Sequence, residues 1–346
     1  MTIKFLQFCL LLLPTLLWSQ DNLDIKVDTR MEALSIFYTL ATADTLDIKP
    51  TPSTYYRDVK LYFEPYKNHE SLNWYRNLDT WDGYDMASLG LFLSKQHPFT
   101  IAVKPQVNYI RSSPTETFLY HFNKFYADTD MYGFINKHKK LHESVCQNAK
   151  DAVIASGILN HIQSFYGTTV DSKFVIYLDL LNNLGSNAIN SDDPGFVNER
   201  IFRLAYLNDE SKHLTDESPV LFTPYINVVT HEVSHLFLKE FIPKYRQRLY
   251  KISQLFLTTS NGEVLNEIEW ENELDELLVR VCTARILAQK FGHEKGIEEI
   301  NNQAKHFKLA KPLYEFFQTY ISNRSLYKEV TMFYPEIVAF LENYNE

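Results

Sequence analysis

The sequence has little cysteine, little glycine and no excess of basic charge. Three cysteines in 346 residues are too few for a disulfide framework, and ten glycines and thirteen prolines without a period exclude collagen-like or linker-dominated chains. The net charge of -9 provides no basic surface for nucleic acid, so we expect no nucleic-acid partner. What the chain does have is 45% hydrophobic residues, with 24 Phe and 22 Tyr, enough for a sizeable core.

The first residues have the form of an export signal. One charge, Lys4, precedes an apolar run from Phe5 to Trp18, and polar residues follow from Ser19. This run suits a signal-peptide core but is shorter than the roughly 20 residues of a membrane helix, so a membrane anchor is the weaker alternative. We therefore predict a signal peptide over residues 1–19 and export to the periplasm or beyond the cell. No later apolar run is long enough to predict a membrane span in the mature protein.

Two cysteines, Cys146 and Cys282, remain after this cleavage. Neither has a partner at the spacing of a metal site. In an oxidising compartment they could form a disulfide, and two buried free thiols are an equal alternative. Cysteine chemistry therefore does not define the function.

Hydrophobic patterning predicts a mixed first part of the chain. Met31–Ala41 is amphipathic, and Val59–Phe63 has the composition of a strand. Aromatic and aliphatic residues follow a helical period over residues 115–166. Phe174–Leu178 (FVIYL) is the clearest strand, because it is short, β-branched and aromatic.

The second part of the chain is expected to be helical. Thr223 followed by proline is a helix-start signal, and Pro243 is expected to end that central helix. The order of elements predicts an α+β fold of zincin-like type, with an α/β lobe over residues 20–243 and a helical lobe over 244–346. We expect the two lobes to share a cleft, and we leave the oligomeric state open.

The central helix contains the motif His231-Glu232-Val233-Ser234-His235, an HExxH. At about 100° per residue, positions four apart lie one turn apart on the same face, so both imidazoles can bind one ion. Catalytic zinc takes three protein ligands and leaves a position for water. Glu232 lies too far round the helix to bind the same ion but close enough to accept a proton from water there. The motif therefore predicts one Zn²⁺ per chain, with His231 and His235 as ligands and Glu232 as general base.

A third ligand must come from elsewhere in the chain. No third histidine stands at HExxHxxGxxH spacing, which favours a glutamate on the acidic helix expected over about 267–289. Four glutamates there are candidates: Glu269, Glu271, Glu273 and Glu276. The apolar stripe of that helix passes closest to Glu273, so periodicity favours Glu273 without deciding which face meets the metal.

These motifs resemble the gluzincin class of zinc metallopeptidases, which have the thermolysin-like architecture. THEVSH is followed about 40 residues later by the glutamate helix, with Trp270 and the run Glu276-Leu277-Leu278-Val279-Arg280. Together with FNKFYADTDMYGFINKH and FVIYLDLLNN, they resemble a family of secreted bacterial proteins classed as a domain of unknown function and regarded as candidate metallopeptidases. In that family the acidic residue that opens the E-x-L-V-R run is the expected third ligand. The resemblance therefore implies Glu276, with Glu273 as the alternative.

One position departs from the thermolysin pattern, which places an acidic residue one turn after the ligand glutamate. Arg280 stands there, so Asp275 or Glu273 would have to orient the metal-binding imidazole instead. The donor that stabilises the developing oxyanion is not identified by the sequence. A substrate-binding strand is predicted at FVIYLDL or at the Gly185–Asn190 stretch that follows it, with a plain core strand as the stronger alternative.

These observations predict an exported zinc metallohydrolase, a peptidase that acts on peptide or protein substrates. Two alternatives stay open. The same chemistry serves other amides and esters, and the chain could instead be an inactive binding protein that keeps a zincin fold. Glu232 argues against the inactive protein, because a structural metal site does not need it.

Overall fold

The computed structural model describes residues 22–43, 49–167, 173–189, 196, 199–206, 213–257, 266 and 269–344. The predicted signal peptide lies outside these residues. The α-helices of the first half are α1 (Thr29–Thr42), α2 (Thr54–Phe63), α3 (Glu70–Arg76), α4 (Thr115–Asp128), α5 (Met131–Lys137), α6 (Lys139–Ser156) and α7 (Ile158–Tyr166). Those of the second half are α8 (Ile226–Leu238), α9 (Phe241–Tyr250), α10 (Trp270–Phe291), α11 (His293–Gln303), α12 (Ala310–Ser322) and α13 (Val330–Glu342). Short 3₁₀ turns occur at η2 (Glu64–Tyr66), η3 (Met86–Phe92) and η6 (Ser253–Phe256).

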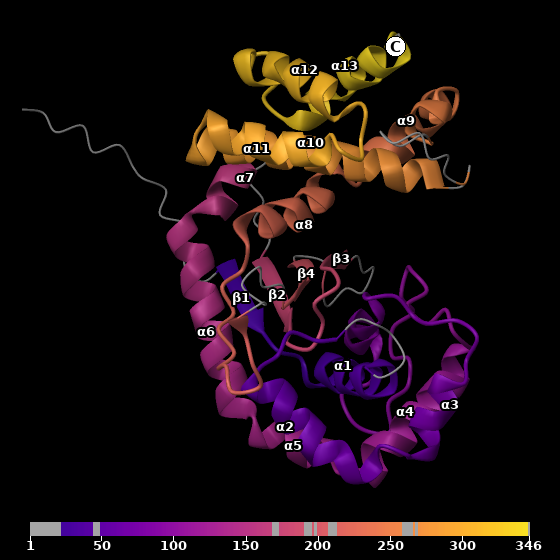
Figure 1. The fold of residues 1–346 in the computed structure, drawn as a ribbon. Coiled ribbons are helices and arrows are strands. Elements are labelled where there is room, and N and C mark those ends of the chain that lie inside the picture. The colour runs from indigo at the N-terminus through magenta and orange to yellow at the C-terminus, as the bar shows by residue number, and fades with distance from the viewer. Residues whose placement is uncertain are drawn as a thin grey trace, which may run out of the picture.

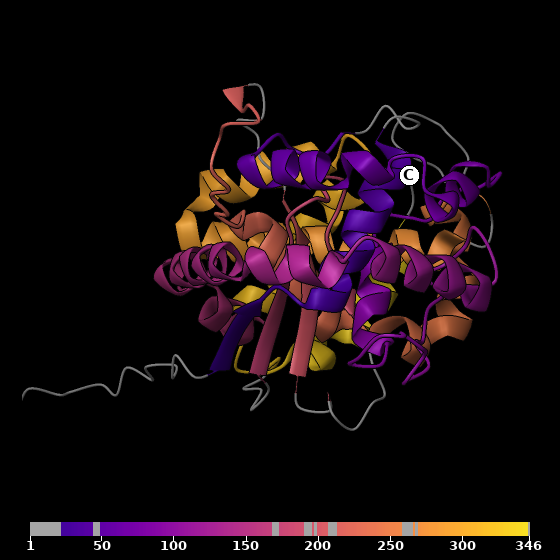
Figure 2. The ribbon, with the colours of Figure 1, turned by 90° about the horizontal axis from the view of Figure 1, so that it is seen from below.

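A small sheet lies at the centre of the molecule. Its strands are β1 (Leu23–Lys26), β2 (Lys173–Asp179), β3 (Asn187–Ile189) and β4 (Glu199–Ala205). The order is β1-β2-β4-β3, with β1, β2 and β4 parallel and β3 antiparallel to β4 at the edge. Figure 2 shows β1, β2 and β4 side by side. The chain is therefore a mixed α+β protein in which helices predominate.

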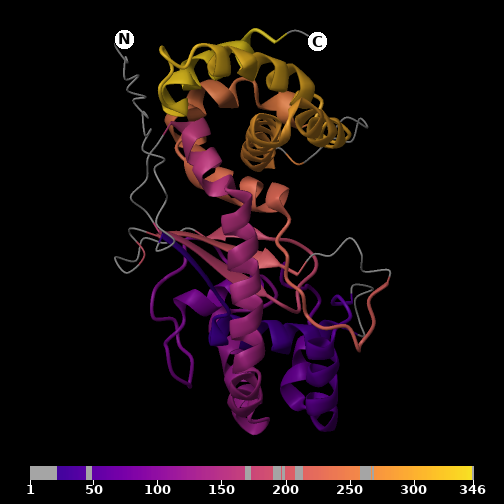
Figure 3. The ribbon, with the colours of Figure 1, turned by 90° about the vertical axis from the view of Figure 1, so that its left-hand side faces the viewer.

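Helices cover the sheet from two sides (Figure 1). Helices α1 to α5 lie below it, α8 lies directly above it, and α10 to α13 form the layer above α8. Helices α6 and α7 run as a long column that joins the lower and upper layers (Figure 3). This arrangement places the edge strand β3 and helices α8 and α10 around one region of the molecule.

Helix α8 is built from apolar residues on its buried side and polar residues on the other. Val229 and Val233 are fully buried, one turn apart. Two buried hydroxyls bond back to carbonyls one turn earlier: Thr230 Oγ1 donates to Ile226 O at 2.6 Å and Ser234 Oγ to Thr230 O at 2.7 Å. These two hydroxyls are therefore buried with their hydrogen bonds made.

Three predictions from the sequence are wrong, one on the type of an element and two on the ends of the central helix. Val59–Phe63 is not a strand but the end of α2, because Tyr55, Val59 and Phe63 recur at four-residue spacing and bury one helical face. The central helix is shorter than expected, since Tyr225 is extended and α8 starts only at Ile226. Pro243 does not end a helix but lies in the first turn of α9, where its missing N–H costs nothing.

The cysteines are free. Cys146 is half-buried on α6, and Cys282 is buried on α10. Burial raises the pKa of the Cys282 thiol to about 12, which keeps it protonated and unreactive at neutral pH. The sequence left a disulfide and two free thiols as alternatives, and the structure has two free thiols. Among the described residues, no helix is both long and apolar enough to cross a membrane.

Candidate metal centre

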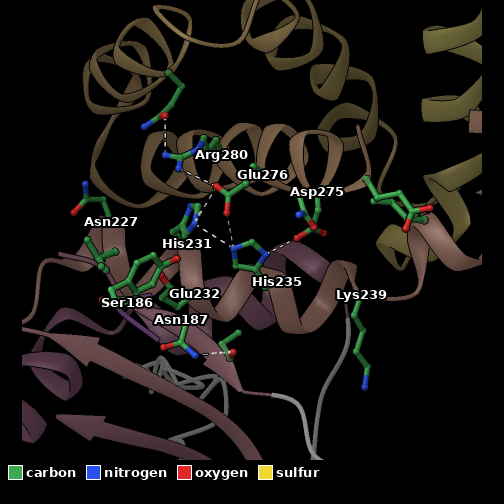
Figure 4. Close-up of a pocket in the computed structure, with 18 of the residues that line it drawn as sticks. Ser186, Asn187, Asn227, His231, Glu232, His235, Lys239, Asp275, Glu276 and Arg280 are labelled. Atoms are coloured by element: carbon green, nitrogen blue, oxygen red, sulfur yellow. Dashed lines mark hydrogen bonds and ion pairs between the residues drawn. The ribbon is translucent and has the colours of Figure 1, made fainter. Parts of the chain in front are cut away.

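Helix α8 presents both histidines of the HExxH motif on the side that faces α10. His231 and His235 lie one turn apart, and their Nε2 atoms approach to 3.2 Å (Figure 4). Their side chains are only 16% and 19% exposed, so both rings are held in a partly enclosed place. The motif thus brings two imidazole nitrogens to one point, as its spacing predicts.

Helix α10 crosses α8 and supplies the carboxylates. Glu276 Oε2 lies 3.5 Å from His231 Nε2, and Glu276 Oε1 lies 3.5 Å from His235 Nε2. Glu273 instead lies near His306, with 3.4 Å between Oε2 and Nε2. The structure therefore groups Glu276 with the two histidines, as the family resemblance implies and against the preference from periodicity. The preference from periodicity was wrong because α10 is buried on several faces. Its apolar stripe therefore does not identify the face that meets α8.

Asp275, the neighbour of Glu276, orients one imidazole. Asp275 Oδ2 lies 2.6 Å from His235 Nδ1. Because an ionised carboxylate only accepts hydrogen bonds, His235 donates from Nδ1, which leaves Nε2 facing Glu276. The sequence left Asp275 and Glu273 as candidates to orient the metal-binding imidazole. In the structure it is Asp275 that contacts His235.

Burial and neighbouring charges set the ionisation of the motif. The pKa of His231 lies well below its usual value, because burial disfavours its cation and His235 and Arg280 add positive charge. Burial also lowers the pKa of His235, but the hydrogen bond and charge of Asp275, with the charge of Glu276, outweigh it and raise the value. Burial raises the pKa of Glu232 to about 7, and this side chain is only 5% exposed.

The three side chains fit a metal ion. Their ligand atoms all lie within 4.8 Å of one another. Two ligands bound tetrahedrally at zinc distances are about 3.3 Å apart, close to the separations of 3.2 and 3.5 Å found here. Glu276 Oε2 is buried and accepts no hydrogen bond, although Arg280 Nη2 lies 2.8 Å away as an ion pair. The other oxygen, Oε1, faces His235 Nε2 at 3.5 Å, and a carboxylate oxygen beside two imidazole nitrogens is a set of donors that suits zinc.

The centre opens into a cavity of about 840 Å³. Residues of α8 and α10 line it, together with Tyr84 and the segment Gly185–Ala188, whose last two residues belong to β3. Figure 4 shows Ser186 and Asn187 of this segment on the side of α8 away from α10. Gly185 allows close packing here, since a Cβ on it would meet the Tyr84 ring at 3.1 Å. Sequence reasoning did not find Tyr84, because nothing local distinguishes it from the other tyrosines. The expected substrate strand Gly185–Asn190 does contain β3 at the cavity, whereas FVIYLDL forms β2 inside the sheet.

The comparisons with known proteins bear on the family alone. Neither a curated protein nor a solved structure matches the chain. One family model, described as "Domain of unknown function (DUF4932)", matches residues 42–340. That range contains strands β2 to β4, the HExxH helix and the glutamate helix, but not β1. Because the match covers most of the sequence, the chain belongs to the DUF4932 family.

Proposed function

We propose that this chain is an exported zinc metallohydrolase that cleaves peptide bonds. The observation that carries the proposal is the convergence of His231, His235 and Glu276 beside the buried carboxyl of Glu232. Two imidazoles and one carboxylate are the protein ligands of many catalytic zinc sites, which keep a further position for water. Export is supported by the signal-like sequence of residues 1–19.

Zinc held by these ligands would polarise a substrate carbonyl and acidify water at neutral pH. Glu232 stands on the same helix and has the role of general base. Its pKa, raised by burial to about 7, makes it a carboxyl that can both take and return a proton near neutral pH. It would accept the proton from the attacking water and pass it to the leaving amine.

Tyr84 is the donor that we assign to the developing oxyanion. It lines the same cavity as the histidines and Glu232. Within the described residues its hydroxyl has no hydrogen-bond partner, so it is available to a bound substrate. Burial and the charges of Glu232, Asp85 and Glu276 raise the pKa of the Tyr84 phenol, which keeps its proton in place for donation.

Strand β3 favours a peptide over a small ester as substrate. It pairs with β4 on one side, and no strand among the described residues pairs with its other edge. Asn187 and Ala188 of β3 line the cavity. An extended peptide can add to such an edge through backbone hydrogen bonds, which would lay it across the metal ligands.

The proposed fold relationship is to the zincins of gluzincin type. Three features support it: the HExxH helix α8, the third ligand on the later helix α10, and the antiparallel edge strand β3 beside them. Asp275 takes the place of the acidic residue that Arg280 replaces, since it reaches His235 from the position before Glu276. The departure from the thermolysin pattern therefore does not remove the carboxylate that orients the imidazole.

The decisive experiment compares metal content and peptide hydrolysis in three variants of the mature protein. Glu232→Gln should keep about one zinc per chain and lose roughly 10²- to 10⁴-fold in hydrolysis of a fluorogenic peptide library. His231→Ala should lose the metal and the activity together. His293→Ala, a change at an exposed histidine on α11, should alter neither.

A wild-type protein prepared without chelator that holds no zinc would refute the metal site. A zinc-loaded protein in which Glu232→Gln hydrolyses peptides as fast as wild type would refute the role of the base.

A further inference from the structure

Arg203 of β4 is a fully buried arginine beneath the candidate site. Its exposure is 0%, which is rare for a charged side chain. It forms an ion pair with Asp179 of β2, which is 2% exposed and accepts a hydrogen bond from Arg203 Nη1 at 2.7 Å. The pair is electrically neutral, but a buried pair of this kind is often no more stable than apolar residues of the same size. Its position therefore calls for an explanation other than stability.

The remaining donors of Arg203 bind both parts of the cavity wall opposite α8. Arg203 Nη2 donates to the carbonyl oxygen of Tyr84 at 2.8 Å and to that of Gly185 at 2.9 Å. Arg203 Nε donates to Asn187 Oδ1 at 2.9 Å. The segment around Tyr84 and the segment around β3 are about one hundred residues apart in sequence, and one guanidinium joins them.

The strand register explains why this residue can reach both segments. Arg203 is paired directly with Asn187 across the β3–β4 ladder. Neighbouring bonds reinforce the same junction: Ser186 Oγ accepts from Ala205 N at 3.1 Å, and Ser88 Oγ donates to Asn187 Oδ1 at 3.2 Å. Only arginine offers a planar set of donors that can serve a carboxylate, an amide oxygen and two carbonyls together.

We propose that Arg203 is a positioning residue that fixes the Tyr84 segment and the edge strand β3 to the sheet as one rigid wall of the substrate cavity. The distance between this wall and α8 then stays constant. An extended substrate on β3 and the Tyr84 hydroxyl can therefore meet at the metal ligands. The part of this inference that concerns catalysis rests on the proposed function. The joining of the two segments does not.

Arg203→Lys tests the proposal, because lysine keeps the positive charge opposite Asp179 but cannot make all the hydrogen bonds of the planar guanidinium. Hydrogen exchange followed by mass spectrometry should accelerate at least about threefold in residues 83–88 and 184–189, with α8 and α10 unchanged. In the zinc-loaded protein, KM for an extended peptide should rise roughly tenfold, the effect of one or two lost hydrogen bonds, while kcat changes less and zinc content stays the same.

Arg285→Lys is the matched control. Arg285 is also a buried arginine, on α10, and it donates from Nε to the carbonyl of Tyr314 at 2.7 Å without lining the cavity. This variant should lose stability without the selective rise in KM. If Arg203→Lys does not fold, Asn187→Ala removes the bonds that Asn187 Oδ1 accepts from Arg203 Nε and Ser88 Oγ, keeps the bonds from Arg203 Nη2, and should accelerate exchange in residues 184–189.

Unchanged exchange in both wall segments would overturn the proposal, whatever the activity. Equal changes in KM and kcat for Arg203→Lys and Arg285→Lys would overturn its catalytic part. A wild type without peptidase activity would refute the proposed function, and the exchange measurement would still decide whether Arg203 holds the wall.

Discussion

His235 and Asp275 lie forty positions apart in the sequence and meet at 2.6 Å between Nδ1 and Oδ2. The next residue, Glu276, lies 3.5 Å from Nε2 of the same imidazole. Two consecutive acids of α10 thus contact opposite nitrogens of one ring. The first fixes the tautomer and the second stands where a metal ligand would.

Removing the Asp275 carboxylate should weaken zinc binding without abolishing it. We expect Asp275→Ala to lower zinc affinity by about 10- to 100-fold, and Asp275→Asn to lower it less, because the amide oxygen still accepts from His235. Competition with a chromogenic chelator measures this. Glu271→Ala, a change at an acid of the same cavity that pairs with Arg246, should leave affinity unchanged. An equal loss in both variants would contradict the orienting role.

Glu276 and Glu273 provide a direct comparison of the two candidate ligands. Glu276→Ala should release the zinc, since it removes one of three ligands, while Glu273→Ala should keep about one zinc per chain. Elemental analysis of the purified proteins by mass spectrometry decides between them. Retention of zinc in Glu276→Ala with loss in Glu273→Ala would contradict the geometry found here.

Tyr84→Phe should separate catalysis from binding. Loss of one hydrogen-bond donor to a developing oxyanion costs about 10²- to 10³-fold in kcat, with little change in KM or zinc content. Tyr250→Phe, at an exposed tyrosine on α9, is the control and should behave as wild type. Steady-state kinetics on one fluorogenic peptide suffices. If kcat stays within about twofold of wild type, Tyr84 does not donate to the reacting atoms.

Glu32 should make stability depend on pH. Its carboxyl is buried and accepts from the Tyr55 hydroxyl, and burial raises its pKa from 4.5 to about 8. The folded state therefore binds a proton that the unfolded state loses between these values. Stability from this group is fully present below pH 4.5 and falls by up to about 5 kcal/mol as the pH rises to 8.

Glu32→Gln should remove that dependence, because the amide stays neutral and can still accept from Tyr55. Urea denaturation at pH 5 and pH 8 should show a smaller loss of unfolding free energy for Glu32→Gln than for wild type. Glu143→Gln, at an exposed position on α6, should follow wild type. Parallel curves for all three proteins would show that Glu32 does not carry the effect.

Local geometry is what the sequence determined by itself. The HExxH spacing places two imidazoles on one helical face whatever surrounds the helix, so His231 and His235 were predicted as a pair. The strand at Phe174–Leu178 was likewise predicted correctly, because a short β-branched and aromatic run is locally distinctive. The prediction of a strand at Val59–Phe63 was wrong, because it considered these five residues without Tyr55. The four-residue spacing of Tyr55, Val59 and Phe63 is that of a helix.

Contacts between distant segments were decided only by the tertiary structure. Which face of α10 meets α8 depends on how two buried helices cross, and this selected Glu276 and Asp275 over Glu273. The Tyr84 segment is held beside the cavity by residues distant in the sequence, since Arg203 and Asn182 both donate to its backbone carbonyl. Every residue has a backbone carbonyl group. The sequence of a segment therefore does not indicate which of its carbonyls will accept a hydrogen bond from a distant side chain.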